Sequence, residues 1–376
     1  MDHLQAVHSR NARPGASACV IKGDGMTQRF IRRAWYFGCW SQEVPIGSAK
    51  EVNLLGESIA VYRSESGGLN ALGNRCPHRF APLHKGVVRG EALECAYHGL
   101  QFGPKGNCVF SPHHRGANPS GIKVQAYAAA EKHGAVWLWG AEAELADPAS
   151  IPDLSELDVF PETAIGSFPS MDVQANYELL IDNLFDPTHA DWVHYGILGD
   201  GLLSLGKAKV EKRDGSIEAT WHYEGQIVVP ILRPIAADGS VWDSWVSARW
   251  YAPSIICFGA GVMPTGRPVS EGMWLNTYHI LVPTGPDSCT YAVKNVRNHD
   301  LEDGALTART VESSLIAFNE QDKPMIEAQQ AMMRGRGFWD LKPALLPSDG
   351  PAIIVRRALE EMIERERLAK DVAAAC

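Results

Sequence analysis

The chain has 376 residues, of which 45% are hydrophobic and 21% are charged, and its formal net charge is −9. This length allows about two domains with sizeable cores, and the composition is that of a globular protein. The negative charge argues against a nucleic acid as the main partner, because phosphate binding needs clustered positive charge. The sequence contains no apolar run of the roughly 18 to 20 residues that a membrane-spanning helix needs.

Eight cysteines are scattered along the chain and do not form the dense pattern of a disulfide framework. This distribution is typical of a reducing compartment. The first 25 residues lack the apolar core of a signal peptide, so we expect a cytoplasmic protein. We also expect residues 1–29, which are mostly polar, to form a disordered tail ahead of the fold.

Short strand-like runs, broken by glycine and proline, extend from Ala34 to about Gly140. The clearest runs cover residues 51–55, 58–63, 67–72 and 134–140. We therefore expect residues 30–145 to form a small antiparallel β domain, with two ligand-bearing loops inserted between its strands.

The two inserted loops carry cysteine and histidine in the same order. The first reads Cys76-Pro-His78, and the second, sixteen residues later, reads Cys95-Ala-Tyr-His98. In a Rieske [2Fe–2S] centre two cysteines hold one iron and two histidines hold the other. The alternative is a single zinc ion, but zinc fingers group their ligands by type, whereas each loop here supplies one of each. The pattern favours a one-electron carrier.

A passage rich in proline and aspartate, residues 147–170, is the best candidate boundary between two domains. Six strand-like runs follow it, at residues 207–213, 216–223, 245–251, 255–261, 274–282 and 289–296. Two helical segments, about 307–333 and 351–374, end the chain. We expect residues 146–376 to form an α+β domain in which helices gather on one face of an antiparallel sheet.

A second candidate metal site follows the boundary. Asp182, Asp186 and His189 are spaced four and three residues apart, so on a continuous helix they would share one face. His194 follows His189 by five residues, which is about 140° of rotation on a regular helix. Both histidines can reach one ion only if the helix is broken or widened, and Pro187 is a residue that interrupts helices.

Two histidines close in sequence, with a distant carboxylate, form the facial triad of non-haem Fe(II) enzymes, which leaves coordination positions open for oxygen and substrate. The alternative is a polar helix face whose histidines are satisfied by hydrogen bonds. The run Asp-x3-Asp-x2-His-x4-His, in one chain with the cysteine–histidine loops, favours the iron site.

The chain resembles the oxygenase component of the Rieske non-haem iron oxygenases from about Trp35 to the C-terminus. It is most similar to the branch that contains dicamba monooxygenase and vanillate O-demethylase. The resemblance is carried by residues 76–83, 97–100, 176–184 and 356–359. It implies a Rieske β domain joined to a helix-grip catalytic domain, a head-to-tail homotrimer, and electron transfer from the cluster of one subunit to the mononuclear iron of its neighbour.

The resemblance also implies roles for single residues. His189 and His194 would bind the iron, and Asp186 would bridge toward His98 of the adjacent subunit. The family pattern selects Asp322, within residues 318–327, as the third iron ligand.

Two of these assignments are less direct. Spacing alone leaves Glu320 open as an alternative to Asp322. His279 is assigned to the substrate pocket because it sits where the dicamba enzyme keeps a pocket histidine.

The electron donor is expected to be a separate protein. The sequence has no Gly-x-Gly-x-x-Gly stretch and no spare four-cysteine spacing for a plant-type ferredoxin centre. A separate NAD(P)H-dependent reductase, with or without a ferredoxin, is therefore the implied partner, and dioxygen is the co-substrate. Three basic residues beside the cluster loops, Arg79, Lys85 and Arg89, either steer an acidic donor or form ordinary solvated surface.

We expect monooxygenation of a small aromatic compound, in which attack on an alkyl group attached to oxygen or nitrogen removes that group. The apolar run from Ser254 to Phe258 stands where the dicamba enzyme has an amide side chain for its acid substrate, so a neutral substrate such as an N-alkoxyalkyl anilide is favoured. One alternative is hydroxylation of the ring, including cis-dihydroxylation, on the same iron. The other is a Rieske electron carrier without oxygenase activity, which the 200-odd residues beyond the cluster domain count against.

Overall fold

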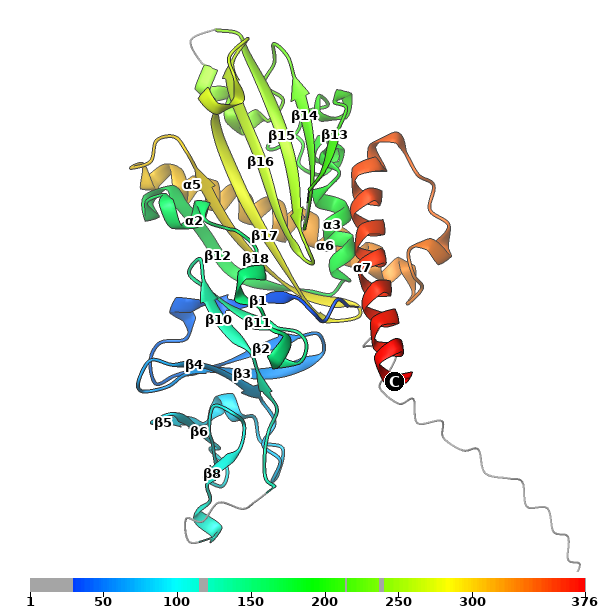
Figure 1. The fold of residues 1–376 in the computed structure, drawn as a ribbon. Coiled ribbons are helices and arrows are strands. Elements are labelled where there is room, and N and C mark those ends of the chain that lie inside the picture. Colours follow the sequence, from blue (N-terminus) through cyan, green and yellow to red (C-terminus); the bar gives the residue numbers. More distant parts are fainter. Residues whose placement is uncertain (1–29, 115–120, 214, 237–239, 376) are drawn as a thin grey trace, which may run out of the picture.

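The computed structural model describes residues 30–375 except 115–120, 214 and 237–239. The expected N-terminal tail, residues 1–29, lies outside the described residues. The described chain is elongated, with small β-sheets at one end and a large twisted sheet with helices at the other (Figure 1). Among the described residues, no helix has both the length and the apolar character required to cross a membrane.

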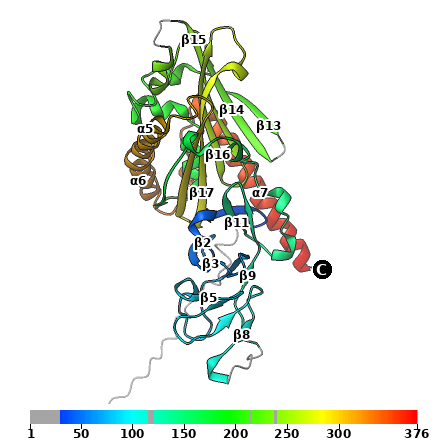
Figure 2. The ribbon, with the colours of Figure 1, turned by 90° about the vertical axis from the view of Figure 1, so that its left-hand side faces the viewer.

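The N-terminal part consists of three small antiparallel sheets arranged along the long axis (Figures 1 and 2). The first contains β1 (Trp35–Trp40), β11 (Ala135–Trp139) and β10 (Ala129–Lys132), in that order. The second contains β2 (Ala49–Leu54), β3 (Glu57–Arg63), β4 (Leu69–Gly73) and β9 (Ala126–Tyr127). The third contains β5 (Val87–Arg89), β6 (Ala92–Glu94), β7 (Gln101–Phe102) and β8 (Cys108–Phe110).

The hydrophobic pattern of the strands explains this stacking. Strand β11 is the central strand of its sheet, and all five of its residues are buried, so it reads as an uninterrupted apolar run. The β1 and β2 strands contact β17 of the large sheet, and the Leu55 backbone N–H donates to the Pro283 carbonyl at 2.7 Å. The first two sheets therefore share a core with the large sheet, while the third has a separate small core around its cysteine loops.

The large sheet has seven antiparallel strands in the order β12-β18-β17-β16-β15-β14-β13. Their bounds are β12 (Ile165–Val173), β13 (Lys209–Arg213), β14 (Ser216–Tyr223), β15 (Trp242–Tyr251), β16 (Ile255–Pro264), β17 (Met273–Gly285) and β18 (Ser288–Arg297). Six of these strands overlap the six runs that the sequence predicts. The expected α+β architecture is confirmed.

The sequence did not predict β12, because Pro169 lies inside it. The structure places β12 at the edge of the sheet, beside β18, with a shift of register between Phe168 and Met171. Proline is tolerated on an edge strand because its missing N–H faces away from the ladder. The passage that was predicted as a boundary, residues 147–170, therefore also contains the first part of the edge strand β12.

Helices cover one face of this sheet (Figure 2). Their bounds are α3 (Tyr177–Leu184), α4 (Ala190–Val193), α5 (Gly304–Leu315), α6 (Lys323–Met333) and α7 (Gly350–Ala375). The short helix α2 (Glu156–Val159) lies on the other face, where Glu156 accepts hydrogen bonds from Asn276 and Tyr278 of β17. Helices α5 and α6 are joined without a break by a π-helical segment, Ile316–Asp322. Helix α7 packs along α3, and α3 contacts β16 and β17.

A buried arginine of α7 forms ion pairs with two carboxylates of α3. Arg356 is 5% exposed and forms ion pairs with Glu178 and Asp182. Its guanidinium also lies 4.3 Å from the centre of the Phe338 ring. Removing one partner of such a buried pair leaves an uncompensated charge, which is strongly destabilising. The pairing is structural, and it accounts for Asp182 without assigning it to a metal site.

Candidate metal centres

The first candidate centre is built from two loops with the same backbone hydrogen bonds. In the first loop, Cys76 N–H donates to the Ala81 carbonyl and Phe80 N–H donates to the Cys76 carbonyl, both at 2.9 Å. In the second loop, Cys95 N–H donates to the Leu100 carbonyl at 2.8 Å, and a glycine N–H four residues after Cys95 returns to its carbonyl at 2.9 Å. The two loops are therefore equivalent turns that present cysteine and histidine in the same way.

These turns separate the two ligand types. Cys76 and Cys95 are each 2% exposed and belong to the small core, whereas His78 is exposed and His98 is half-buried. The two imidazole rings lie 4.4 Å apart between centres. Burial, together with the neighbouring Cys95, raises the pKa of the Cys76 thiol to about 11. A bound metal deprotonates a coordinating thiol, so Cys76 and Cys95 would hold an iron as thiolates.

A third imidazole lies beside this centre. The ring of His113 is 5.9 Å from that of His98 and 6.5 Å from that of His78, and its Nε2 lies 3.2 Å from the His98 carbonyl oxygen. Nothing in its sequence spacing connects His113 with the two loops.

The second candidate centre lies where helix α3 gives way to two short turns. Helix α3 ends at Leu184, a 3-10 turn covers Pro187–His189, and α4 follows directly. Asp186 caps the 3-10 turn, with Oδ1 accepting from the Thr188 N–H at 3.0 Å. The expectation that Asp182, Asp186 and His189 share one helix face was wrong, because the helix ends between the first two. The break expected at Pro187 is present.

The break brings two histidines to one carboxylate from a distant helix. His194 Nε2 lies 3.1 Å from Asp322 Oδ1, and His189 Nε2 lies 3.6 Å from the same oxygen. One ligand atom of each of the three residues lies within 4.8 Å of the others. Asp322 is the last residue of the π-helical segment and is buried, whereas Glu320 is exposed and outside this group.

Hydrogen bonds to the far side of each imidazole fix its direction. His194 Nδ1 lies 2.7 Å from Gln321 Oε1, and His189 Nδ1 bonds the Asp186 carbonyl. Both Nε2 atoms therefore face Asp322. The sequence analysis missed Gln321, and its position next to Asp322 was the only signal available. Such partners orient metal-bound imidazoles and hold their tautomer.

Among the described residues, the buried Asp322 Oδ2 has no hydrogen-bond partner, and the buried His194 Nε2 has only its ion pair with Asp322 Oδ1. Burial lowers the pKa of His194, but Asp322 and Gln321 outweigh it and the net shift is upward. The site therefore favours a positive charge at this nitrogen. Buried polar atoms without partners are rare in proteins. A divalent cation would satisfy both atoms, and two imidazoles with one carboxylate form the donor set of non-haem Fe(II).

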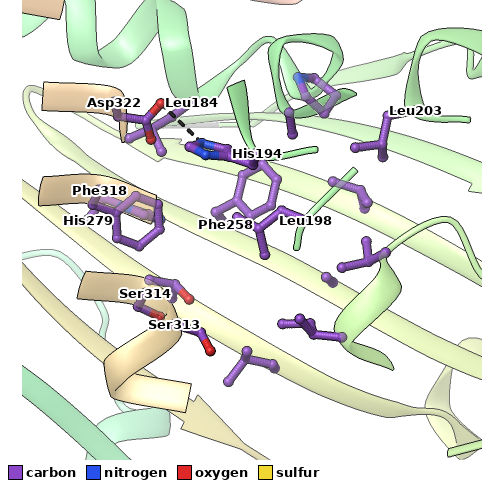
Figure 3. Close-up of a pocket in the computed structure, with 18 of the residues that line it drawn as sticks. Leu184, His194, Leu198, Leu203, Phe258, His279, Ser313, Ser314, Phe318 and Asp322 are labelled. Carbon is purple, nitrogen blue, oxygen red and sulfur yellow. Dashed lines mark ion pairs between the residues drawn. The ribbon is translucent and has the colours of Figure 1, made fainter. Parts of the chain in front are cut away.

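The three residues stand at one end of a cavity between the sheet and the helices (Figure 3). Most of its wall is apolar, with Leu184, Leu198, Leu203, Val246, Phe258 and Leu275 among the lining side chains. Apolar pockets with a few convergent polar groups are the usual form of small-molecule sites.

His279 lies in this wall. Its Nδ1 lies 2.5 Å from the Tyr291 hydroxyl, its ring packs edge-on against Phe318 at 4.8 Å, and its Nε2 is buried without a partner among the described residues. Burial lowers the pKa of His279 to about 3. The imidazole is therefore neutral at physiological pH, and Nε2 is free to meet a polar group of a ligand.

Asp191, which lies between His189 and His194 in the sequence, holds the loop at residues 201–204 by hydrogen bonds. The sequence analysis did not identify it. Its carboxylate accepts from the N–H groups of Gly201 at 2.8 Å, Leu203 at 3.3 Å and Ser204 at 2.8 Å, and from the Ser204 hydroxyl at 2.6 Å. Leu203 lines the cavity. The same segment thus positions the histidines and one wall of the cavity.

Comparisons with known proteins agree with both halves of this arrangement. Residues 34–128 match the Rieske [2Fe-2S] domain, and residues 173–365 match the vanillate O-demethylase oxygenase C-terminal domain. The chain is 32% identical over 350 residues to the chloroacetanilide N-alkylformylase oxygenase component of Rhizorhabdus wittichii, which covers 92% of this chain and 99% of the relative. It is 31% identical to the dicamba O-demethylase oxygenase component of Stenotrophomonas maltophilia, over 90% of this chain and 99% of the relative.

The crystal structure of dicamba monooxygenase bound to dicamba superimposes with a TM-score of 0.80 at 31% identity, and covers 90% of this chain and 99% of that one. Another crystal structure of that enzyme, with non-haem iron and dicamba, superimposes with a TM-score of 0.76. The two family matches include both candidate centres, residues 76–98 and residues 189–322. The chain therefore belongs to the Rieske non-haem iron oxygenases, enzymes that combine a Rieske [2Fe–2S] cluster with a mononuclear iron.

Proposed function

We propose that this chain is the terminal oxygenase of a multicomponent monooxygenase that removes an alkyl group from oxygen or nitrogen of a small aromatic substrate. The observation that carries the proposal is the meeting of two imidazoles and one carboxylate, whose buried Oδ2 has no hydrogen-bond partner among the described residues, at the end of a largely apolar cavity. The relatives named above act by O-demethylation or N-dealkylation, which supports this reaction.

We assign the metal ligands from the donor sets and from the family pattern. Cys76, His78, Cys95 and His98 hold the [2Fe–2S] cluster. His189, His194 and Asp322 hold the mononuclear iron, and the exposure of Glu320 supports Asp322 as the third ligand. The family matches leave residues 129–172 between them, which supports a domain boundary near residue 145.

The bound iron supplies the activation of dioxygen. The reaction consumes one dioxygen, two electrons and two protons for each methyl ether cleaved, and yields a phenol, formaldehyde and water. The residues of the chain hold the substrate and exclude water. The apolar wall surrounds the alkyl group near His189 and His194, and neutral His279 offers Nε2 to a polar group of the substrate.

Electrons reach the iron from the cluster of a neighbouring subunit in a head-to-tail homotrimer. The cluster loops lie on the sheet at the end of the chain away from the catalytic sheet (Figure 1), so transfer within one subunit would cross the whole N-terminal part. Asp186 lines a surface hollow together with Met325 and Leu345. From there it bridges to His98 of the adjacent subunit.

Exposed apolar side chains support this docking. Phe80 and Tyr97, beside the cluster, are 70% and 63% exposed. Trp192, which lies between His189 and His194 in the sequence, is 83% exposed, and Met325 is 53% exposed. Exposed apolar patches of this kind commonly mark protein–protein contacts.

A separate protein supplies the electrons, because the relatives are named as oxygenase components of larger systems. We propose an NAD(P)H-dependent reductase, acting directly or through a ferredoxin. Arg79, Lys85 and Arg89 are exposed beside the cluster and would attract an acidic donor.

Turnover under labelled dioxygen tests the reaction class. The holoenzyme, a compatible reductase and a panel of methoxy- and N-alkyl aromatics are incubated, and the products are identified by mass spectrometry. Release of an aldehyde together with the dealkylated aromatic supports the proposal. A retained ring diol or ring hydroxyl, with the alkyl group intact, would instead establish ring hydroxylation.

A further inference from the structure

One side of the cavity is formed by a row of side chains on a single helical line. Thr310, Ser314, Phe318 and Asp322 recur every four residues, and all four line the cavity. At about 1.5 Å of rise per residue, Ser314 lies roughly 12 Å from Asp322 along the helix. Figure 3 shows Ser313 and Ser314 on the opposite side of His279 and Phe318 from Asp322 and His194. The cavity thus has an iron end and a hydroxyl end.

At the hydroxyl end, two serine hydroxyl protons have no acceptor among the described residues. Ser314 Oγ accepts from Asn295 Nδ2 at 3.0 Å, so its own proton points elsewhere. The Ser313 hydroxyl makes no hydrogen bond to another residue in the described part of the chain. The Thr310 hydroxyl, by contrast, donates to the Leu306 carbonyl at 2.9 Å. Two serine protons are therefore available to an acceptor in the cavity.

The same end has no positive charge. Among the residues that line the cavity in the described chain there is no lysine or arginine, and the only acidic one is Asp322 at the iron end. A carboxylate or sulfonate bound beside the serines would lose its hydration without gaining a counter-ion, which is costly in an apolar site. An uncharged acceptor, such as an amide carbonyl, loses less hydration and regains hydrogen bonds from the two hydroxyls.

We propose that Ser313 and Ser314 determine substrate specificity by donating hydrogen bonds to an uncharged acceptor. That acceptor lies on the side of the aromatic ring opposite the alkyl group that is oxidised. The proposal rests on the proposed dealkylation and names its substrate class: a neutral aromatic with a carbonyl-type group about one ring length from the ether or amine. Asn295 is a positioning residue, because its amide fixes the direction of the Ser314 hydroxyl.

Three anisoles of equal length and shape test the proposal. They carry an amide (4-methoxybenzamide), a carboxylate (4-methoxybenzoate) or an isopropyl group (4-isopropylanisole) at the far end. Their dissociation constants for the holoenzyme are measured by titration calorimetry near pH 7.5. We expect the amide to bind at least about tenfold more tightly than the carboxylate. Ser313→Ala and Ser314→Ala should each weaken amide binding about three- to tenfold, and change binding of the isopropyl compound less than twofold.

Glu312→Ala, on the exposed side of the same helix, is the matched control and should leave all three constants unchanged. Equal or tighter binding of the carboxylate overturns the proposal, as does a failure of the amide to bind. Loss of isopropyl binding to the same degree as amide binding in the serine variants also overturns it. Ser314→Ala also removes the acceptor of the Asn295 amide and can shift that side chain. Ser313→Ala removes a hydroxyl that has no partner in the described chain, so its effect on binding is free of this complication.

Formaldehyde release from the same three compounds separates this proposal from the reaction it rests on. Amide binding as expected, with no formaldehyde from any compound, contradicts the dealkylation and leaves the specificity assignment standing. Formaldehyde release with 4-methoxybenzoate as the preferred ligand supports the dealkylation and refutes the role of the two serines.

Discussion

The cluster loops and the iron triad gather their proposed ligands in opposite ways. The loops supply four proposed ligands from 23 consecutive residues, residues 76–98, and each loop is closed by its own backbone hydrogen bonds. The triad draws two proposed ligands from a broken helix and the third from a helix more than a hundred residues later. The first site is therefore fixed locally, whereas the second exists only when the large sheet and its helices are assembled.

The two regions also differ in their contact with water. His78 is exposed and His98 half-buried, while His194 is 1% exposed. An imidazole at the surface lets an electron enter or leave by protein contact. An enclosed triad keeps water away from the oxidising chemistry and makes each local interaction stronger. Four variants can break or sharpen this contrast.

The largest effect is expected from His194→Ala, which removes a proposed iron ligand from the triad and leaves the cluster loops unchanged. Iron should fall from about three to about two atoms per chain, because the [2Fe–2S] cluster is held elsewhere. Oxygenation should be abolished. Elemental analysis and the visible spectrum measure the two centres separately, and Glu320→Gln is the control that should keep all the iron. Unchanged iron in His194→Ala would favour a pure electron carrier.

Asp186→Asn should keep both metal centres and lose about 100-fold in turnover, because it weakens the link between subunits and leaves the ligands in place. The rate at which the reduced cluster is reoxidised in a single turnover measures electron transfer from the cluster to the mononuclear iron directly. Normal reoxidation in this variant would contradict the route between subunits.

Asp191→Ala should destabilise the triad region by about 2–4 kcal/mol, because it leaves three backbone N–H groups and a hydroxyl without their acceptor. We expect faster loss of the mononuclear iron to a chelator and an unchanged cluster spectrum. Glu302→Ala, at an exposed position, is the control. Equal loss from both centres would show that the two regions do not unfold separately.

His279→Gln should reduce the dependence of stability on pH. Burial lowers the pKa of His279 from 6.5 in the unfolded chain to about 3, so protons bind the unfolded state better and stability is lost as pH falls below 6.5. Between pH 7.5 and 5 this loss amounts to about 2 kcal/mol, and it should disappear in the variant. Denaturant unfolding at the two pH values measures it, with exposed His113→Gln as the control. An unchanged pH dependence would mean that His279 is accessible to protons.

The same contrast explains what the sequence could predict. The cysteine–histidine loops are local, so their spacing and the residues around them favoured a Rieske centre over zinc. The other six strands of the large sheet followed from hydrophobic runs, but β12 was hidden by Pro169, whose position at a sheet edge depends on the tertiary structure. For the triad, spacing left Asp322 and Glu320 open, and only the family pattern chose between them. Gln321 and Asp191 act through contacts that no local pattern records.

The π-helical segment Ile316–Asp322 has a consequence for how the protein tolerates changes in length. Its i→i+5 bonding holds one more residue per turn than an α-helix would. The wide turn absorbs its extra residue and leaves the residues beyond it nearly in phase. A residue added there and absorbed as regular α-helix would instead turn the residues beyond by about 100° relative to the serines, and Asp322 would point away from the two imidazoles. This wide turn therefore sets the rotation about the helix axis between Ser313 and Ser314, which we propose select the substrate, and Asp322, the proposed iron ligand.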